Sequence, residues 1–149
     1  MKVISIHTLA TVLALVFVIA FSISAYGEEK FDVKLKITVG DRILAATMLN
    51  NDTSRDFISL LPLTLTLKDY AGREKISDLP KRLSKQGATS GSDPSVGDIT
   101  YYSPWGNLAI FYKDFGYSSG LIILGRIVTG IEKLESMRSD FKVRIELMD

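Results

Sequence analysis

The feature that most constrains the fold is a strict alternation of apolar and polar residues, which is cleanest in two widely separated segments. In residues 31–39, FDVKLKITV, every second side chain is apolar, and an extended chain places such side chains on one face. Residues 141–148, FKVRIELM, repeat the pattern. We therefore predict a half-buried β-strand in each segment.

The segment between these strands begins with further regular structure. Gly40 and Asp41 form a two-residue turn signal, so residues 42–49 are expected to return as the second arm of a hairpin. This arm is apolar on both faces, which predicts deeper burial than for the first. Asn51, Asp52 and Thr53 offer side-chain oxygens to cap a short helix, whose apolar positions continue until Pro62 stops it.

The remaining elements follow from local pattern and turn residues. Residues 77–96 lack a sustained period and contain scattered glycine and proline, so we expect a long surface excursion there. Strands are predicted at 63–67, 98–103, 107–113 and 121–128, with a turn at 104–106 and a second short helix that carries Ile131, Leu134 and Met137. The fold class is thus mainly β, with about seven or eight strands and two short helices in a closed or nearly closed β-barrel.

Residues 1–27 have the pattern of a secretory signal peptide. Lys2 precedes an apolar core, and small residues at Ala25 and Gly27 come before Glu28, which is typical of a cleavage site. The alternative is an uncleaved membrane anchor, because the uncharged run is long enough to cross a bilayer, which needs about 20 residues. Either interpretation predicts export to the periplasm, the medium or the cell surface. Residues 28–149 form the predicted domain, and only an uncleaved N-terminal segment would contact the membrane.

Charge and cysteine content exclude several classes of function. The chain has 18 basic and 17 acidic residues, and removal of Lys2 with the leader leaves no net formal charge. Such a domain has no electrostatic footprint for nucleic acid. Because the chain has no cysteine, it has no disulfide, thiolate metal site or cysteine nucleophile. We expect no metal and no cofactor.

Several motifs together resemble a known family. Residues 124–137, LGRIVTGIEKLESM, resemble a late strand and helix of cyclophilins. Residues 97–115, GDITYYSPWGNLAIFYKDF, with ITVGD at 37–41, LLPLTLTL at 60–67 and DLP at 78–80, are similar to the bacterial cyclophilin-like domain family. The resemblance extends over essentially all of residues 28–149, and it implies a cyclophilin-like barrel. Members of that family are mostly of unknown function.

The resemblance does not transfer an active site. Cyclophilins isomerise the bond before proline, and their site uses a histidine, an F-H-R segment and a Q-G-G segment. In this chain the single histidine is His7, in the predicted leader, and no F-H-R segment exists. Gln86 and Gly87 lie in the irregular region without a flanking strand. Since a shared fold does not imply a shared reaction, we assign no catalytic residue.

Aromatic residues crowd the segment from residue 101 to residue 117. Aromatic rings can line a ligand pocket, because they give a large contact area at a small entropic cost, but they also pack cores. We assign Phe111 and Tyr112 to the core. The candidate ligand-binding residues, which lie at or near turns or beside a glycine, are Tyr102, Trp105, Phe115, Tyr117 and Arg126.

These observations lead to three functional hypotheses. The first is an exported, non-catalytic module that binds a small molecule or a short peptide in an aromatic pocket near one barrel mouth. The second is a peptidyl-prolyl cis-trans isomerase with a non-standard active site. The third is an interaction module of the cell envelope or surface. Asp98, beside Gly97 and before a strand, is expected to organise a turn rather than to donate protons.

Overall fold

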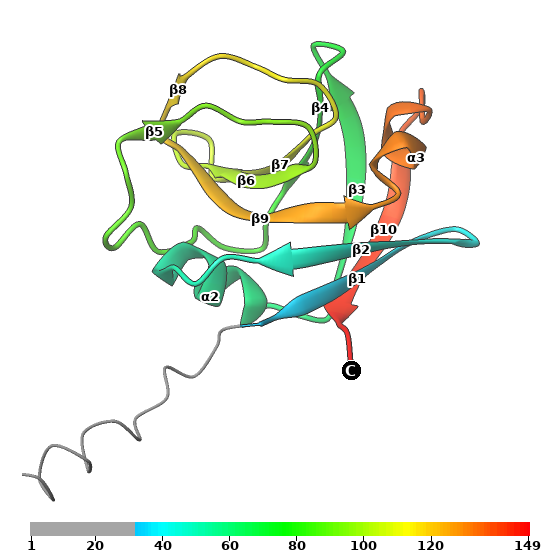
Figure 1. Ribbon diagram of the computed structural model, residues 1–149, viewed down its shortest axis with the longest axis horizontal. Helices are drawn as coiled ribbons and strands as arrows, with labels where there is room; N and C mark the ends of the chain where they lie inside the picture. Colours follow the sequence, from blue (N-terminus) through cyan, green and yellow to red (C-terminus); the bar gives the residue numbers. More distant parts are fainter. Residues whose placement is uncertain (1–31) are drawn as a thin grey trace, which may run out of the picture. The chain divides into compact units, whose positions relative to one another are not determined.

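The computed structural model describes residues 32–149 (Figure 1). The predicted signal peptide or anchor, residues 1–27, lies outside the described residues. Eight strands form the main sheet: β1 (Lys34–Val39), β2 (Arg42–Met48), β3 (Leu63–Tyr70), β4 (Glu74–Asp78), β6 (Asp98–Tyr102), β7 (Asn107–Phe111), β9 (Leu121–Thr129) and β10 (Phe141–Leu147). The other elements are helices α2 (Asp52–Ile58) and α3 (Ile131–Glu135) and the two-residue strands β5 (Gly91–Ser92) and β8 (Ser118–Ser119).

The eight long strands close into a barrel in the order β1-β10-β3-β4-β7-β6-β9-β2, and all their pairings are antiparallel. Strands β5 and β8 form a separate two-stranded sheet. Figure 1 shows β5, β8 and their connections above β6 and β7. The predicted mainly β barrel with two short helices is therefore confirmed, and closure leaves the barrel no free edge strand.

The alternation near the start of the domain produces the predicted hairpin. Ile37 of β1 is buried and pairs with Leu44 of β2 and with Ile145 of β10. Gly40 turns the chain with φ 59°, a conformation that glycine adopts without steric cost. The expectation that β2 is buried more deeply than β1 is wrong, because Ile43 is 56% exposed and the buried residues of each strand lie on one face only.

Helix α2 begins within the predicted capping segment, residues 51–53, and Asn51 is its cap. The Asn51 side chain accepts a hydrogen bond from the Ser54 amide at 2.8 Å, and Phe57 of the helix is buried in the core. The helix ends at Ile58, one turn before Pro62. Residues between the helix and Pro62 form a turn rather than the helical extension that the apolar spacing predicted.

The expected surface excursion at residues 77–96 is partly wrong. Strand β4 extends into it as far as Asp78, and Leu83 is buried in the core. The sequence of β4, EKISD, was missed because it does not alternate between apolar and polar residues. Its second residue, Lys75, is nevertheless almost completely buried.

The barrel wall separates two apolar clusters. The large core cluster fills the interior and includes Leu108 and Ile110 of β7. A smaller cluster contains Ala109 and Phe111 of the same strand, together with Ile76 and Leu121. Because successive side chains of a strand point to opposite faces, the smaller cluster lies on the outer face of the wall. This outer face carries the candidate site.

Candidate functional site

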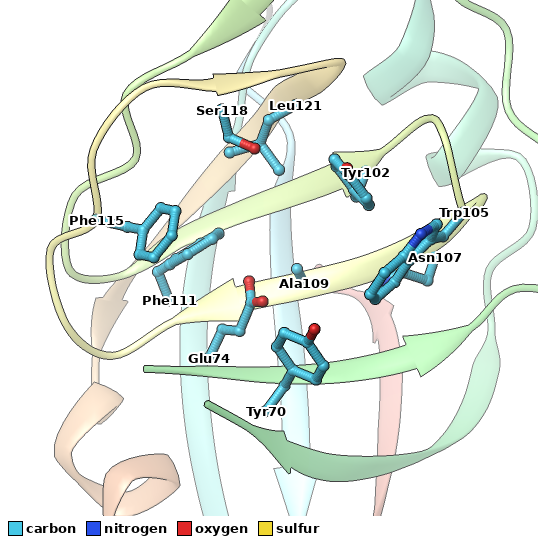
Figure 2. Close-up of a pocket in the computed structure, with 10 residues that line it drawn as sticks. All are labelled: Tyr70, Glu74, Tyr102, Trp105, Asn107, Ala109, Phe111, Phe115, Ser118 and Leu121. Carbon is cyan, nitrogen blue, oxygen red and sulfur yellow. The ribbon is translucent and has the colours of Figure 1, made fainter. Parts of the chain in front are cut away.

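The described residues form a pocket on the outer face of the barrel, over β7 (Figure 2). Its volume is about 190 Å³. The lining residues are Tyr70, Glu74, Tyr102, Trp105, Asn107, Ala109, Phe111, Phe115, Ser118 and Leu121. The sequence predicted an aromatic pocket near a barrel mouth, whereas this pocket lies on the outer face of the barrel wall.

Strand register brings distant parts of the chain together in this pocket. Glu74 of β4 pairs with Tyr70 of β3 on one side and with Phe111 of β7 on the other. Tyr102 of β6 pairs with Asn107 of β7 and with Leu121 of β9. Directly paired residues point to the same face of a sheet. Adjacent strands therefore present one continuous row of outward side chains.

Aromatic rings form two walls of the pocket. Trp105 meets Tyr70 edge to face, with ring centroids 5.7 Å apart, and meets Tyr102 similarly at 5.3 Å. Phe111 and Phe115 face each other at 6.1 Å on the opposite side. Edge-to-face and offset arrangements are the favoured geometries for such pairs. Figure 2 shows the Glu74 carboxylate between the Phe111 and Phe115 pair and the Tyr70 and Trp105 pair.

Glu74 is an unpaired acid in this apolar setting. Among the described residues its carboxylate has no hydrogen-bond or ion-pair partner, and burial alone raises its pKa to about 7. Burial disfavours the charged form of an acid, since it removes water without supplying a counter-charge. The next residue, Lys75, does not help, because it points to the other face of β4 and pairs with Asp69 at 2.8 Å.

Asn107 supplies a second unpaired acceptor. Its side chain is buried, with 4% of the residue exposed, and its Nδ2 donates to the Leu108 carbonyl at 3.1 Å. Its Oδ1 has no hydrogen-bond partner in residues 32–149. A buried polar atom without a partner costs about 1–3 kcal/mol. Two residues of the pocket lining thus carry acceptor oxygens that lack donors.

The structure places the five predicted site residues in different surroundings. Tyr102, Trp105 and Phe115 line the pocket. Tyr117 is outside the lining and 62% exposed, with its hydroxyl 3.1 Å from Ser90 Oγ. Arg126 is also outside the lining, and its Nε donates to Asp98 Oδ1 at 2.8 Å.

Several other expectations concern residues near these. Asp98 accepts a hydrogen bond from the Ser95 amide at 2.8 Å and so organises the turn before β6, as predicted. Phe111 and Tyr112 are both buried, as expected of core residues. Phe111 lies on the outer cluster, however, and its ring also lines the pocket.

Sequence reasoning missed much of the lining. The unpredicted residues are Tyr70, Glu74, Asn107, Ala109, Ser118 and Leu121. Alternation along NLAIF could have indicated that Asn107, Ala109 and Phe111 share a face. No local signal distinguishes Glu74 from other surface acids, because its burial depends on residues that other strands and their connections contribute.

Other features of the described residues offer less for recognition. A second pocket contains Asn51 and Thr53, but Asn51 already bonds to Ser54 and Ile123, and Thr53 bonds to Ser84. Within residues 32–149, no group of three or more His, Cys, Asp or Glu side chains is placed to hold a metal ion. None of the described helices is long and apolar enough to cross a membrane.

Comparison with known proteins identifies the family. Residues 37–146 match the family model described as the Cyclophilin-like family, so the chain belongs to that family. It is also similar to the solution structure of a hypothetical protein from Archaeoglobus fulgidus, with 19% identity and a TM-score of 0.59. The likeness covers 82% of this chain and 99% of the other, and it shows a common fold. No curated protein matches the chain.

Proposed function

We propose that the domain is a non-catalytic binding module that holds a small molecule, or one side chain of a short peptide, in the outer aromatic pocket. The observation that carries this proposal is the open aromatic pocket with two acceptor oxygens that lack donors. A ligand with a donor group would satisfy these oxygens and cover the rings. The leader-like sequence of residues 1–27 adds the proposal that the module acts outside the cytoplasm.

The size of the pocket indicates a compact occupant. Its volume of about 190 Å³ lies below the range of roughly 300–1,000 Å³ that is common for drug-sized ligands. Five of the ten lining residues are aromatic, and three of them, Tyr70, Trp105 and Phe115, are exposed at the rim. An entering group can therefore replace water on rings that already have their positions fixed by neighbours.

The described residues favour binding over prolyl isomerisation. A prolyl isomerase of the cyclophilin type uses an arginine beside the pocket that holds the proline ring, but the lining includes no arginine. Arg73 lies over the Phe115 ring, 5.7 Å from its centroid, and donates to the Asp114 carbonyl at 3.2 Å. The unpaired polar atoms of the pocket are acceptors, which suit a donor ligand.

A fluorescence screen tests this proposal. Trp105 is the single tryptophan of the chain and forms a pocket wall, so its emission reports on occupancy. We expect compounds from a fragment library to shift this emission saturably in the full chain. Ala109→Leu fills the floor of the pocket and should abolish the shift, whereas Ala45→Leu, on the outer face of β2, should not.

Two results would contradict the proposal. Hits that bind Ala109→Leu as well as wild type would place binding elsewhere, and circular dichroism would establish that this variant is folded. If Ala109→Leu fails to fold, Phe115→Ala replaces it, with weaker binding expected. In a prolyl-peptide assay we expect no rate above background, and a rate that Ala109→Leu removes would make the module an enzyme.

A further inference from the structure

We propose that the occupant of the aromatic pocket is an organic cation, an ammonium group that Glu74 receives as its counter-ion and Asn107 Oδ1 helps to bind. This inference rests on the proposed function and names the ligand class for the same site. It is carried by the position of an unpaired carboxylate among five aromatic rings, a combination that favours a positive charge over a neutral ligand.

The aromatic walls attract a cation through their faces. Each ring carries negative potential on its face, and a cation within about 6 Å of a ring centroid is stabilised, most strongly by tryptophan. Trp105 stands nearly perpendicular to both Tyr70 and Tyr102, at 86° and 81°. Rings at right angles form a corner that presents different faces and edges to one guest, as in cages for quaternary ammonium groups.

The acceptors in the pocket match the same guest. Glu74 provides a negative charge and Asn107 a partial negative charge, and neither has a donor among the described residues. An anion would face the Glu74 carboxylate, and a neutral apolar ligand would leave both oxygens unpaired, which is costly in a desolvated site. A cation is the guest for which all parts of the lining act together.

The surroundings of Glu74 predict that cation binding depends on pH. The other titratable groups in the lining are Tyr70 of β3 and Tyr102 of β6. Near Glu74 in sequence, Arg73 stacks on Phe115 of the covering loop, and Lys75 faces the opposite side of β4. Strands β7, β8 and β9 contribute no charged side chain to the lining. With the Glu74 pKa at about 7, the counter-charge forms between pH 6 and pH 8.

The experiment compares choline, which supplies a positive charge and a hydroxyl donor, with its neutral isostere 3,3-dimethyl-1-butanol, which keeps the hydroxyl but lacks the charge. In the full chain at pH 8, we expect choline to change Trp105 emission saturably and the isostere to bind at least tenfold more weakly. A second arm uses a short peptide with trimethyllysine and the same peptide with norleucine. Tighter binding of the peptide than of choline would identify a side chain as the source of the cation, and tighter binding of choline would identify a free small-molecule cation.

Variants separate charge from shape. Glu74→Gln should weaken choline binding roughly tenfold at pH 8, while the exposed control Glu132→Gln leaves it unchanged. Choline keeps its charge at every pH, so wild-type affinity should rise up to roughly tenfold from pH 6 to pH 8 as Glu74 ionises. Glu74→Gln should lose that dependence. Both proteins are first compared by circular dichroism.

The outcomes distinguish this inference from the proposed function. Equal binding of choline and its isostere, or unchanged affinity in Glu74→Gln, would overturn the cation assignment and leave the pocket as a ligand site. No binding of either cationic probe would also overturn it. Only if the fragment screen likewise finds no compound that Ala109→Leu excludes does the proposed function fail as well.

Discussion

Glu74 and Lys75 are adjacent in β4 and lie on opposite faces of the barrel wall. Lys75 has several polar partners, whereas Glu74 has none among the described residues. Lys75 is 1% exposed, yet its ammonium pairs with Asp69 at 2.8 Å, donates to the Met137 carbonyl and lies 5.0 Å from the Tyr112 ring centroid. Tyr112 also donates to Asp69, at 2.6 Å. Glu74, less buried, has no such partners among residues 32–149.

The difference shows how a charged residue that stabilises the fold can be distinguished from one that is available to bind a ligand. The donors Lys75 and Tyr112 hold the pKa of Asp69 below its usual value, and burial with the Asp69 hydrogen bond raises the pKa of Tyr112 to about 12. The charged groups of this cluster bond to one another and to the Met137 carbonyl, so we call it the paired cluster and expect it to stabilise the fold rather than bind a ligand. The Glu74 carboxylate is unpaired among the described residues, and its pKa is raised because it is buried without a partner.

The largest expected change in stability follows from mutation of the paired cluster. Lys75→Met should destabilise the protein by about 2–4 kcal/mol, because it leaves Asp69 without its cation; the solvent contact of Asp69 keeps the loss below that of a fully buried pair. Urea unfolding followed by circular dichroism measures it. Lys142→Met, on the exposed side of β10, should stay within about 0.5 kcal/mol. Equal losses of stability in the two variants would contradict a special stabilising role for Lys75.

Mutation of the unpaired Glu74 should change stability in the opposite direction and stabilise the protein. Glu74 binds its proton more tightly in the folded state, so its contribution to stability is present below about pH 4.5 and is lost as pH rises through about 7. Glu74→Gln mimics the protonated acid and should stabilise the protein at pH 8 by about 1–2 kcal/mol, a value reduced for residual solvent contact. At pH 4 the variant and wild type should unfold alike. A destabilised variant at pH 8 would reveal a partner for Glu74.

The smallest effects are expected at the rim. Trp105 and Tyr117 are 58% and 62% exposed, so Trp105→Ala and Tyr117→Ala should each cost less than about 1 kcal/mol in thermal or urea unfolding. Of the two, only Trp105→Ala should weaken ligand binding, which calorimetry measures without the tryptophan signal. A large loss of stability in either variant would assign that residue to the core.

The sequence predicted the parts of the fold that depend on local pattern. Alternation located most of the barrel strands, and the capping segment at residues 51–53 located the start of α2. The alternation pattern missed β4, because Lys75 lies at a barrel-facing position where the pattern requires an apolar residue. That assignment requires Asp69 and Met137 to be nearby, which only the closed barrel determines.

The candidate site was predictable to a lesser extent for the same reason. Tyr102, Trp105 and Phe115 were recognisable as aromatic residues at turns, and the structure brings them together. Tyr117 has the same local character but contacts Ser90. Arg126 pairs with Asp98 across β6 and β9. Which turn residue covers a pocket depends on how the loops fold over the wall, and a pattern of residues does not encode this.

The outward position of the pocket has a consequence for how such a domain can change over time. On β7, Leu108 and Ile110 maintain the core, while Ala109 and Phe111, between and beside them, shape the pocket. Folding and recognition therefore draw on alternate residues of one strand. Mutation can explore new ligands through one set while the other preserves the barrel, so the fold can be inherited by proteins whose ligands differ.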